Sequence, residues 1–198
     1  MITADYHLHS SFSGDSKAPM ENMIQAAIKK GMTHICFTEH MDMDYPVSDA
    51  TPEGMFTLNT DSYLYDLARF KEKYAKDIKI LFGVELGIQP HLQRELALYA
   101  RAYEFDFIIG STHVTNGKDP YFPAFYEGRS EEEAYREYFN SIIDNIKKFK
   151  NSEQIPPIAN MYLGMKIFCK ILLLRLMEVI AIFVPLLKKS ITQRPAIK

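Results

Sequence analysis

Up to residue 150, the sequence alternates between short runs of apolar and β-branched residues and longer amphipathic stretches. This alternation is typical of consecutive strand and helix units that build a parallel sheet. We expect strands at residues 2–8, 33–38, 79–85 and 106–112. We expect helices at residues 19–30, 61–76, 90–103 and 130–150. Four such units in a row predict an α/β fold whose parallel sheet curls toward a barrel.

The predicted helices carry recognisable start and stop signals. Pro19 opens the first helix and Gly31 closes it, because proline suits the first turn and glycine the position after the last. Asp61 is the expected N-cap of the second helix. Ser130 and Glu133 form a capping box at the start of the fourth helix, in which each side chain can satisfy a backbone amide of the other's turn.

Histidine and acidic residues recur where the predicted strands end. The first strand ends in His7-Leu-His9, and the alternation of an extended chain places both imidazoles on the same side. The other three strands run into segments that contain Glu39, His40, Glu85 and His113. In a parallel barrel the loops at the carboxyl ends of the strands converge on one mouth, so we expect these side chains to meet there. Imidazole with carboxylate is a ligand set for zinc, manganese or iron, and the pattern predicts a metal site.

Two further histidines lie away from these motifs. His34 begins the second strand, at the opposite end from the predicted mouth, and His91 follows Pro90 in the first turn of a helix. We interpret both histidines as structural. The segments 41–60 and 114–129 show no clear periodicity, and long loops of this kind are usually lids or binding loops.

The strand-end motifs resemble those of a known family. The run from Asp5 to Asp15 reads Asp-Tyr-His-Leu-His-Ser-Ser-Phe-Ser-Gly-Asp, and Phe-Thr-Glu-His, Gly-Val-Glu and Ser-Thr-His follow at 37–40, 83–85 and 111–113. In this order and spacing they resemble the first motifs of the polymerase-and-histidinol-phosphatase (PHP) phosphoesterases. The Phe-Ser-Gly-Asp-Ser run after the histidine pair is similar to the histidinol-phosphatase branch. The resemblance spans about residues 1–150 and implies an incomplete, distorted (β/α)7 barrel of about four units.

The same resemblance implies a site for up to three divalent metals, with zinc, manganese or iron as the candidates. His7 and His9 match the pair of ligands on the first metal. Glu85 matches the carboxylate that bridges the first and second metals, which is the central catalytic role. His113 matches a ligand of the second metal.

Four more residues have expected roles around this site. Asp15 and His40 match the ligands of the third metal. Glu39 stands where many relatives carry aspartate, and we expect it to be either a ligand or a hydrogen-bond partner of a ligand imidazole. Arg129, which follows an aromatic loop, is a candidate partner for substrate phosphate, with a solvated loop residue as the alternative.

The resemblance implies that the chain is a metal-dependent phosphomonoesterase, expected to hydrolyse L-histidinol phosphate to L-histidinol and phosphate in histidine biosynthesis. The expected partner is therefore a small-molecule phosphate ester. Two alternatives stay open: a PHP phosphoesterase with another substrate, and a non-catalytic metal-binding or membrane-associated protein. The sequence has no Gly-x-x-x-x-Gly-Lys-Ser phosphate loop, which argues against chemistry on nucleoside triphosphates.

Charge and cysteine content indicate the surroundings in which the chain works. The formal net charge is −2, which offers no concentrated basic surface, and we expect no binding to nucleic acid. The N-terminus shows no basic segment followed by an apolar stretch, so we expect a cytoplasmic protein. Cys36 and Cys169 lie far apart and are interpreted as reduced thiols. No pattern fixes an oligomeric state.

The last part of the chain differs in composition from the rest. We place a boundary between residues 1–154, the front part of the barrel, and residues 155–198, a basic and apolar tail expected to be helical. Residues 160–198 carry 7 Lys and Arg against one acid, whereas residues 1–159 carry 16 against 24. Three explanations compete: a frameshifted or misassembled gene end, a membrane-anchoring helix, or a genuine helical end that covers the open barrel or binds a partner. The charged residues of the apolar stretch disfavour a membrane span.

The tail lacks the later motifs of the family, His-x-Asp and Ser-Asp-x-His. No histidine follows His113 and no aspartate follows Asp144. We therefore expect an incomplete set of metal ligands and an impaired activity. We also expect poor solubility, because a partial barrel has an unpaired edge strand and uncovered apolar faces.

Overall fold

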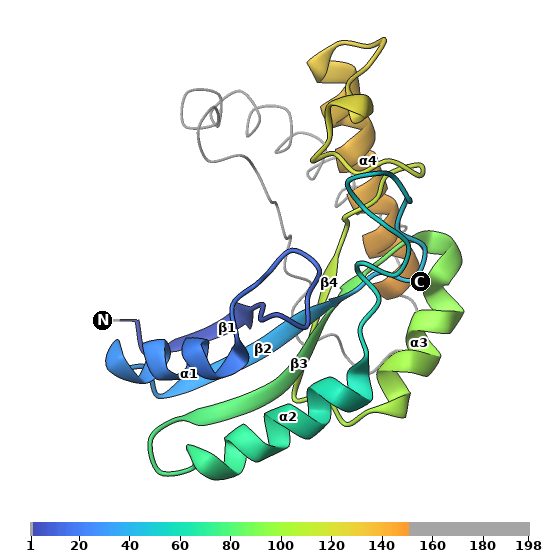
Figure 1. Cartoon of the computed structure of the whole chain (residues 1–198). Coiled ribbons are helices and arrows are strands. Elements are labelled where there is room, and N and C mark those ends of the chain that lie inside the picture. Colours follow the sequence, from blue (N-terminus) through green and yellow to red (C-terminus); the bar gives the residue numbers. More distant parts are fainter. Residues whose placement is uncertain (1, 151–198) are drawn as a thin grey trace, which may run out of the picture. The chain divides into compact units, whose positions relative to one another are not determined.

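The computed structural model describes residues 2–150. Within that range, four strands form one parallel sheet in the order β1-β2-β3-β4 (Figure 1). The strands are β1 (Ala4–Leu8), β2 (His34–Met41), β3 (Lys79–Gly87) and β4 (Phe107–Ser111). The helices are α1 (Met20–Lys29), α2 (Thr60–Lys73), α3 (Gln93–Ala102) and α4 (Glu131–Lys150), with 3-10 turns at Pro90–Leu92 and Pro123–Phe125. This confirms the predicted α/β fold of four strand and helix units. The predicted boundary at 155 and the tail lie outside the described residues.

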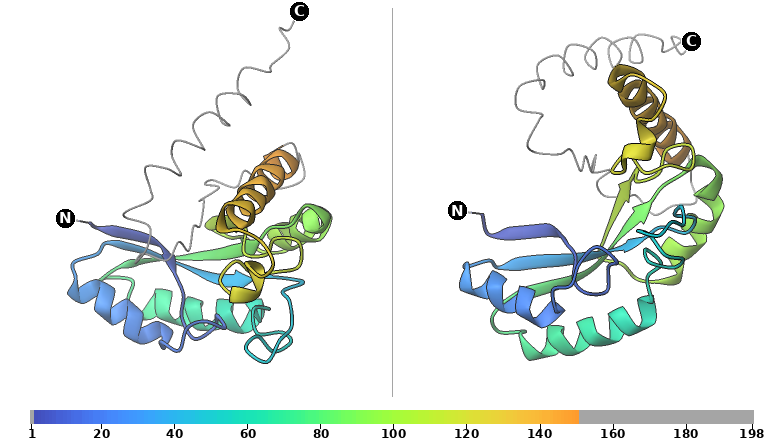
Figure 2. Two further views of the ribbon diagram at one scale, coloured as in Figure 1. Left: turned by 90° about the horizontal axis from the view of Figure 1, so that it is seen from above. Right: turned by 45° about the horizontal axis from the view of Figure 1, so that its top comes forward.

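The apolar core lies between the helices and one face of the sheet. Figure 2 shows that the helices follow the outer face of the curved sheet. The fully buried helical members of the core are Ile24, Tyr63, Leu67 and Leu96. The strands contribute alternate residues to it, among them Ile35, Phe37, Ile80, Phe82 and Val84. Successive side chains of a strand point to opposite faces of the sheet. His40 and Glu85 therefore lie on the inner face, opposite the core.

The start of α2 differs from the prediction. The N-cap is Asn59, whose side-chain oxygen accepts a 3.1 Å hydrogen bond from the backbone N–H of Ser62. The prediction of Asp61 as N-cap is therefore wrong. Asp61 lies in the first turn, where its carboxylate accepts a 3.1 Å hydrogen bond from the Tyr103 hydroxyl. Both side chains are capable caps, and the cap is the one that precedes the first helical residue.

The other helix signals match the structure. The backbone N–H of Ser130 donates to the Glu133 carboxylate at 2.8 Å, and the N–H of Glu133 donates to the Ser130 hydroxyl at 3.3 Å, which confirms the capping box. Pro19 directly precedes α1. Gly31 follows that helix with a φ of +74°, a conformation that side chains disfavour, so its predicted role as the helix stop is confirmed.

The two central strands are longer than predicted. β2 and β3 stay paired from His34 with Lys79 to Met41 with Leu86. His40 and Glu85 therefore lie within the paired strands rather than just beyond them. The polar side chains at this end do not interrupt the strands, because the ladder is made by the backbone. The strand register places His40 directly beside Glu85.

The outer strands are less regular. β1 pairs with β2 through a register shift between Asp5 and Leu8, which indicates a β-bulge in the segment that contains His7. Within residues 2–150, β1 and β4 each pair along one side only. Edges of this kind are the physical basis for the expected poor solubility, which stays a prediction.

Two other features are the state of the cysteines and the character of the helices. Cys36 is buried and carries a free thiol, whereas Cys169 lies outside the described residues. Among the helices of residues 2–150, none combines the length and the apolar character needed to cross a membrane.

Candidate metal centre

Glu85 lies at the centre of a cluster of imidazoles. The Nε2 atoms of His7 and His9 lie 3.0 and 3.2 Å from its Oε2 atom. On its other oxygen, Oε1, the Nε2 atom of His113 lies 3.0 Å away. The hydroxyl of Ser111 donates a 2.6 Å hydrogen bond to the same oxygen. The buried Glu85 carboxylate on β3 is thus in contact with three imidazoles. His7 lies in β1, His9 directly follows β1, and His113 lies in the loop after β4.

His40 connects this cluster to Asp15. Its Nε2 atom lies 3.4 Å from the Asp15 Oδ2 atom. Its ring stacks on that of His9, with ring centres 4.4 Å apart, and lies edge-on to that of His113 at 4.9 Å. The structure therefore brings together all the side chains predicted as metal ligands, namely His7, His9, Asp15, His40, Glu85 and His113.

The two long loops close around the same end of the sheet. Phe56, from the 41–60 loop, packs edge-on against the His40 ring at 5.4 Å. Tyr45 of this loop contacts Phe56 and donates a hydrogen bond to the Asp119 carboxylate in the 114–129 loop. The loops are thereby joined to each other and packed beside the imidazoles, in line with their predicted place at the mouth.

Asp42 belongs to the cluster and was missed by the sequence reasoning. Its Oδ1 atom lies 2.9 Å from the Nδ1 atom of His113, and its Oδ2 atom lies 3.6 Å from the Nδ1 atom of His40. The prediction ended the second strand at residue 38 and placed Asp42 in a loop. Strand pairing continues to Met41, so an acid two residues after His40 was the available signal.

Glu39 is hydrogen-bonded to two serines next to the histidine cluster. Its buried carboxylate accepts 2.5 Å hydrogen bonds from the hydroxyls of Ser10 and Ser13. Since the single Ser13 proton goes to Glu39, the Ser13 oxygen accepts from the backbone N–H of His40 at 3.0 Å and from the Nδ1 atom of His9 at 3.2 Å. Glu39 therefore reaches an imidazole through Ser13 rather than directly. A proton on Nδ1 leaves the Nε2 atom of His9 with a free lone pair.

Arg129 is committed to partners in its own loop and in α4. Its Nε atom donates to the Phe125 carbonyl oxygen at 2.8 Å, and the guanidinium lies 4.3 Å from the centre of the Phe125 ring. A further nitrogen forms an ion pair with Glu137. These contacts give Arg129 a role in holding the loop on α4, and its role as a phosphate partner stays a prediction.

The close packing of acids and imidazoles shifts their pKa values. Burial alone would raise the pKa of Glu85, but its contacts with His113, His7 and His9 hold it well below the usual value. Burial would lower the pKa of His113, yet the charge of Asp42 and the hydrogen bonds to Asp42 and Glu85 raise it to about 10. The pKa of His40 is raised to about 9 against the same effect of burial, by Asp15, Asp42 and Glu85.

The donor atoms fit divalent cations. Several of these buried atoms have no hydrogen-bond partner among the described residues, namely His9 Nε2, both ring nitrogens of His40 and Asp42 Oδ2. In the described part of the chain, three overlapping groups offer ligand atoms within 4.8 Å of one another: His7, His9 and Glu85; His9, Asp15 and His40; His40, Asp42 and His113. Buried polar atoms are rarely left unsatisfied, and nitrogen and oxygen donors of this kind suit zinc, manganese or iron.

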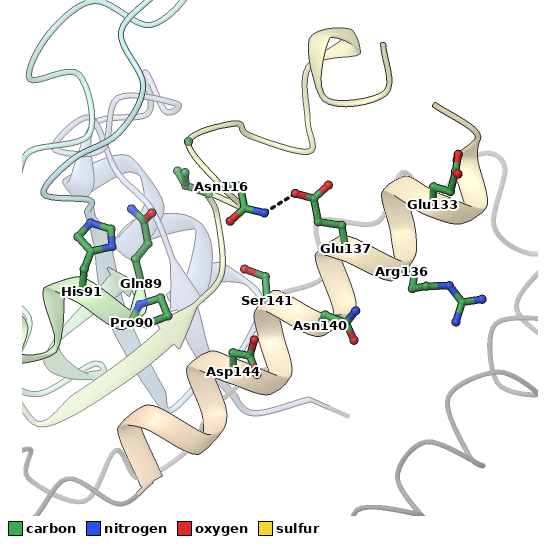
Figure 3. Close-up of a pocket in the computed structure, with 12 residues that line it drawn as sticks. Gln89, Pro90, His91, Asn116, Glu133, Arg136, Glu137, Asn140, Ser141 and Asp144 are labelled. Atoms are coloured by element: carbon green, nitrogen blue, oxygen red, sulfur yellow. Dashed lines mark hydrogen bonds between the residues drawn. The ribbon is translucent and has the colours of Figure 1, made fainter. Parts of the chain in front are cut away.

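A separate pocket of about 490 Å³ lies beside α4 (Figure 3). Its lining includes Gln89 and His91 on one side and Glu137 on the other, where Glu137 accepts a hydrogen bond from Asn116. The Nε2 atom of His91 lies 2.6 Å from the Asp44 carboxylate, outside the metal-ligand groups. His34 is also outside them and lies 2.9 Å from the Thr33 hydroxyl. Neither histidine joins the cluster around Glu85.

Comparison with known proteins identifies relatives of this chain. It is 35% identical over 152 residues to "Histidinol-phosphatase" of Lactococcus lactis subsp. lactis, a match that covers 76% of this chain and 54% of the relative. It is 34% identical over 139 residues to "Probable histidinol-phosphatase" of Clostridium acetobutylicum, covering 70% and 50%. The chain thus spans about half the length of the curated relatives it matches.

Solved structures show the same relationship. The crystal structure of histidinol phosphate phosphatase from Lactococcus lactis subsp. lactis, complexed with zinc, L-histidinol and phosphate, matches with a TM-score of 0.69 and 32% identity. The match covers 80% of this chain and 59% of that one. A structure from Listeria monocytogenes matches with a TM-score of 0.59 and 18% identity, which supports the fold alone.

The family model described as "PHP domain" matches residues 5–162. This range contains the four strands, except for Ala4 at the start of β1, and every side chain of the cluster around Glu85. It also covers more than half of the chain. The chain therefore belongs to the PHP domain family.

Proposed function

We propose that the chain acts as a metal-dependent phosphomonoesterase that hydrolyses L-histidinol phosphate to L-histidinol and phosphate. The observation that carries the proposal is the contact of the Glu85 carboxylate with His7, His9 and His113 at 3.0–3.2 Å. The names of the relatives and the L-histidinol and phosphate in the Lactococcus structure support the substrate. The small-molecule phosphate ester, a cytoplasmic location and the absence of nucleic-acid binding stay part of the proposal.

The residues divide into ligand sets for up to three metals. His7 and His9 would hold the first metal with one oxygen of Glu85, and His113 would hold the second with the other oxygen. Asp15 and His40 would hold the third. Zinc is supported by the Lactococcus complex, and the donor set also suits manganese or iron.

The role of the protein is to place charge and lone pairs. When bound, divalent cations supply positive charge that neutralises a phosphate ester and lowers the pKa of water. Glu85 fixes the distance between two groups of histidines, because one carboxylate oxygen contacts His7 and His9 and the other contacts His113. Glu39 and Ser13 hold the Nδ1 proton of His9, which would leave the Nε2 lone pair of that imidazole free for the first metal beside Glu85.

The experiment is a phosphate-release assay of the purified 198-residue chain with L-histidinol phosphate. We expect release that requires added Zn²⁺ or Mn²⁺ and that a chelator abolishes. His7→Ala should lower the rate by more than about 100-fold, since even residues that only orient metal ligands often cost 10–100-fold. His91→Ala, an exposed histidine outside the cluster, is the matched control and should keep the wild-type rate. Release that is insensitive to chelator or to His7→Ala, or no release at all, would contradict the proposal.

A further inference from the structure

Asp42 is an acid of the metal centre that the assigned ligand sets do not use. It directly follows β2 and is only 4% exposed. Its Oδ1 atom lies 2.9 Å from the Nδ1 atom of His113, within hydrogen-bond distance. The Nε2 atom of the same ring faces Glu85 at 3.0 Å. His113 is therefore placed between two carboxylates, one on each ring nitrogen.

The second oxygen of Asp42 faces His40. Asp42 Oδ2 and His40 Nδ1 are both buried without a hydrogen-bond partner among the described residues, and they lie 3.6 Å apart. His40 Nδ1 is also 3.6 Å from Oε2 of Glu85, but that oxygen already contacts two other imidazoles. Asp42 is therefore the available partner for His40 Nδ1. The Nε2 atom of His40 faces Asp15 instead.

The contacts of an imidazole determine which of its two ring nitrogens can bind a metal. A neutral imidazole carries one proton, and the nitrogen without the proton is the one that binds metal. A carboxylate only accepts hydrogen bonds, so a ring nitrogen that faces it closely carries the proton. Both ring nitrogens of His113 face carboxylates, and Nε2 of His40 faces Asp15, so this rule alone allows a proton on either nitrogen. When a cation occupies the Nε2 side it takes the lone pair there, and the proton of His113, and of His40 after a small approach to Asp42, then lies on Nδ1.

Gly87 provides the space for this carboxylate. A Cβ atom at position 87 would lie 1.9 Å from Oδ1 of Asp42 and 2.5 Å from its Cγ atom. No real side chain tolerates such a contact, so any other residue at this end of β3 would displace Asp42. The glycine is required here for close approach rather than for a special backbone angle.

We infer that Asp42 is a positioning residue that sets the tautomers of His113 and His40 together, so that both present Nε2 to the metals. The inference rests on the proposed metal centre and adds a residue that couples ligands of two different metals. It differs from a direct ligand role, in which Asp42 itself would bind a cation. The two roles give different results when the carboxylate is changed.

The most informative change is Asp42→Asn, which keeps the size of the side chain. An amide has one accepting oxygen and a donating NH2 group, so it can satisfy the Nδ1 proton of only one of the two histidines. The NH2 group would face the other Nδ1 and favour the tautomer with the proton on Nε2. That imidazole would then lose its metal-binding lone pair until its ring is reoriented.

The test is a Co²⁺ titration of the full chain, followed by visible absorption of the bound ion. Asp42→Asn should bind the same number of Co²⁺ ions with the same absorption bands at saturation, but about 10–100-fold more weakly than the wild type. Gly87→Ala, which displaces the carboxylate without removing it, should weaken binding in the same way. Asp44→Asn is the matched control, because Asp44 is exposed and pairs with His91, and it should bind like the wild type.

Three results would overturn the inference. Unchanged affinity in Asp42→Asn would show that the carboxylate does not position the histidines. Loss of one bound ion with altered bands would make Asp42 a direct ligand. Absence of Co²⁺ binding by the wild type would refute the proposed metal centre itself, and that outcome is recognised before any variant is compared.

A measurement on the wild-type chain tests the same inference without relying on the folding of any variant. In the zinc-loaded, ¹⁵N-labelled protein, nitrogen spectra of the imidazoles report which ring nitrogen carries the proton. We expect the proton on Nδ1 in both His40 and His113. A proton on Nε2 of either ring would contradict the inference.

Discussion

Ser13→Ala should destabilise the metal-free chain far more than its small size suggests. The Ser13 hydroxyl is buried and has three partners in the structure. It donates to the Glu39 carboxylate at 2.5 Å and accepts from the His40 backbone N–H at 3.0 Å. It also lies 3.2 Å from His9 Nδ1. Removing one oxygen atom therefore takes one hydrogen bond from the buried Glu39 carboxylate, which keeps those from Ser10, and it removes the acceptor of the His40 amide and of the His9 imidazole.

The expected cost follows from these contacts. A hydrogen bond to a charged group is worth about 1.5–3 kcal/mol, and a buried donor left without an acceptor costs about 1–3 kcal/mol. We expect the free energy of unfolding to fall by about 3–5 kcal/mol, counting the Glu39 and His40 contacts. The loss of the acceptor for His9 Nδ1 should also weaken zinc binding, by about 10–100-fold.

Urea unfolding in the presence of a chelator measures the stability term without the metal. Ser11→Ala is the matched control, since Ser11 lies in the same loop and is exposed. The two variants differ only in whether the lost hydroxyl was buried. If Ser13→Ala lies within about 0.5 kcal/mol of Ser11→Ala, the usual range for surface changes, the hydrogen-bond relay has no energetic weight and the reasoning is wrong.

Three further predictions follow from the structure. The pKa values of His40 and His113 are raised from 6.5 to about 9 and about 10, so their stabilising effect on the metal-free chain is complete below 6.5. It should be lost as the pH rises through these values, and a urea midpoint that rises over this range would contradict the prediction. Asn59→Ala should lower the free energy of unfolding by about 1 kcal/mol through loss of the α2 cap, whereas Asp61→Ala should cost less in the same urea experiment. The purified chain should self-associate at high concentration because of its sheet edges, and a monomer at every concentration in sedimentation experiments would disprove this.

The fold and most of the cluster were predictable because they depend on periodicity. In the structure, alternation along the strands puts Phe37 and Phe82 in the core and His40 and Glu85 on the opposite face. Parallel strands end at one edge of a sheet, so strand-end motifs far apart in sequence had to meet there. This geometry follows from backbone rules, which a sequence reveals well.

The missing parts depend on details that periodicity does not contain. Asp42 was assigned to a loop because its polarity suggested that the strand had ended, whereas the backbone ladder continued past the histidine. The link from Glu39 to His9 runs through Ser13, and a serine gives no signal of such a role in sequence. The ion pair of Arg129 with Glu137 on α4 also gives no signal in sequence, because only tertiary packing brings the two side chains together.

The central claim is that Glu85 bridges two metals, and zinc binding by the full chain tests it most directly. Equilibrium dialysis followed by elemental analysis gives the number of zinc ions bound per chain. We predict more than one ion for the wild type and fewer for Glu85→Gln, which keeps the shape of the side chain but removes its charge. Glu95→Gln, an exposed acid of α3, should bind like the wild type. Equal zinc content in Glu85→Gln and in the wild type would contradict the account.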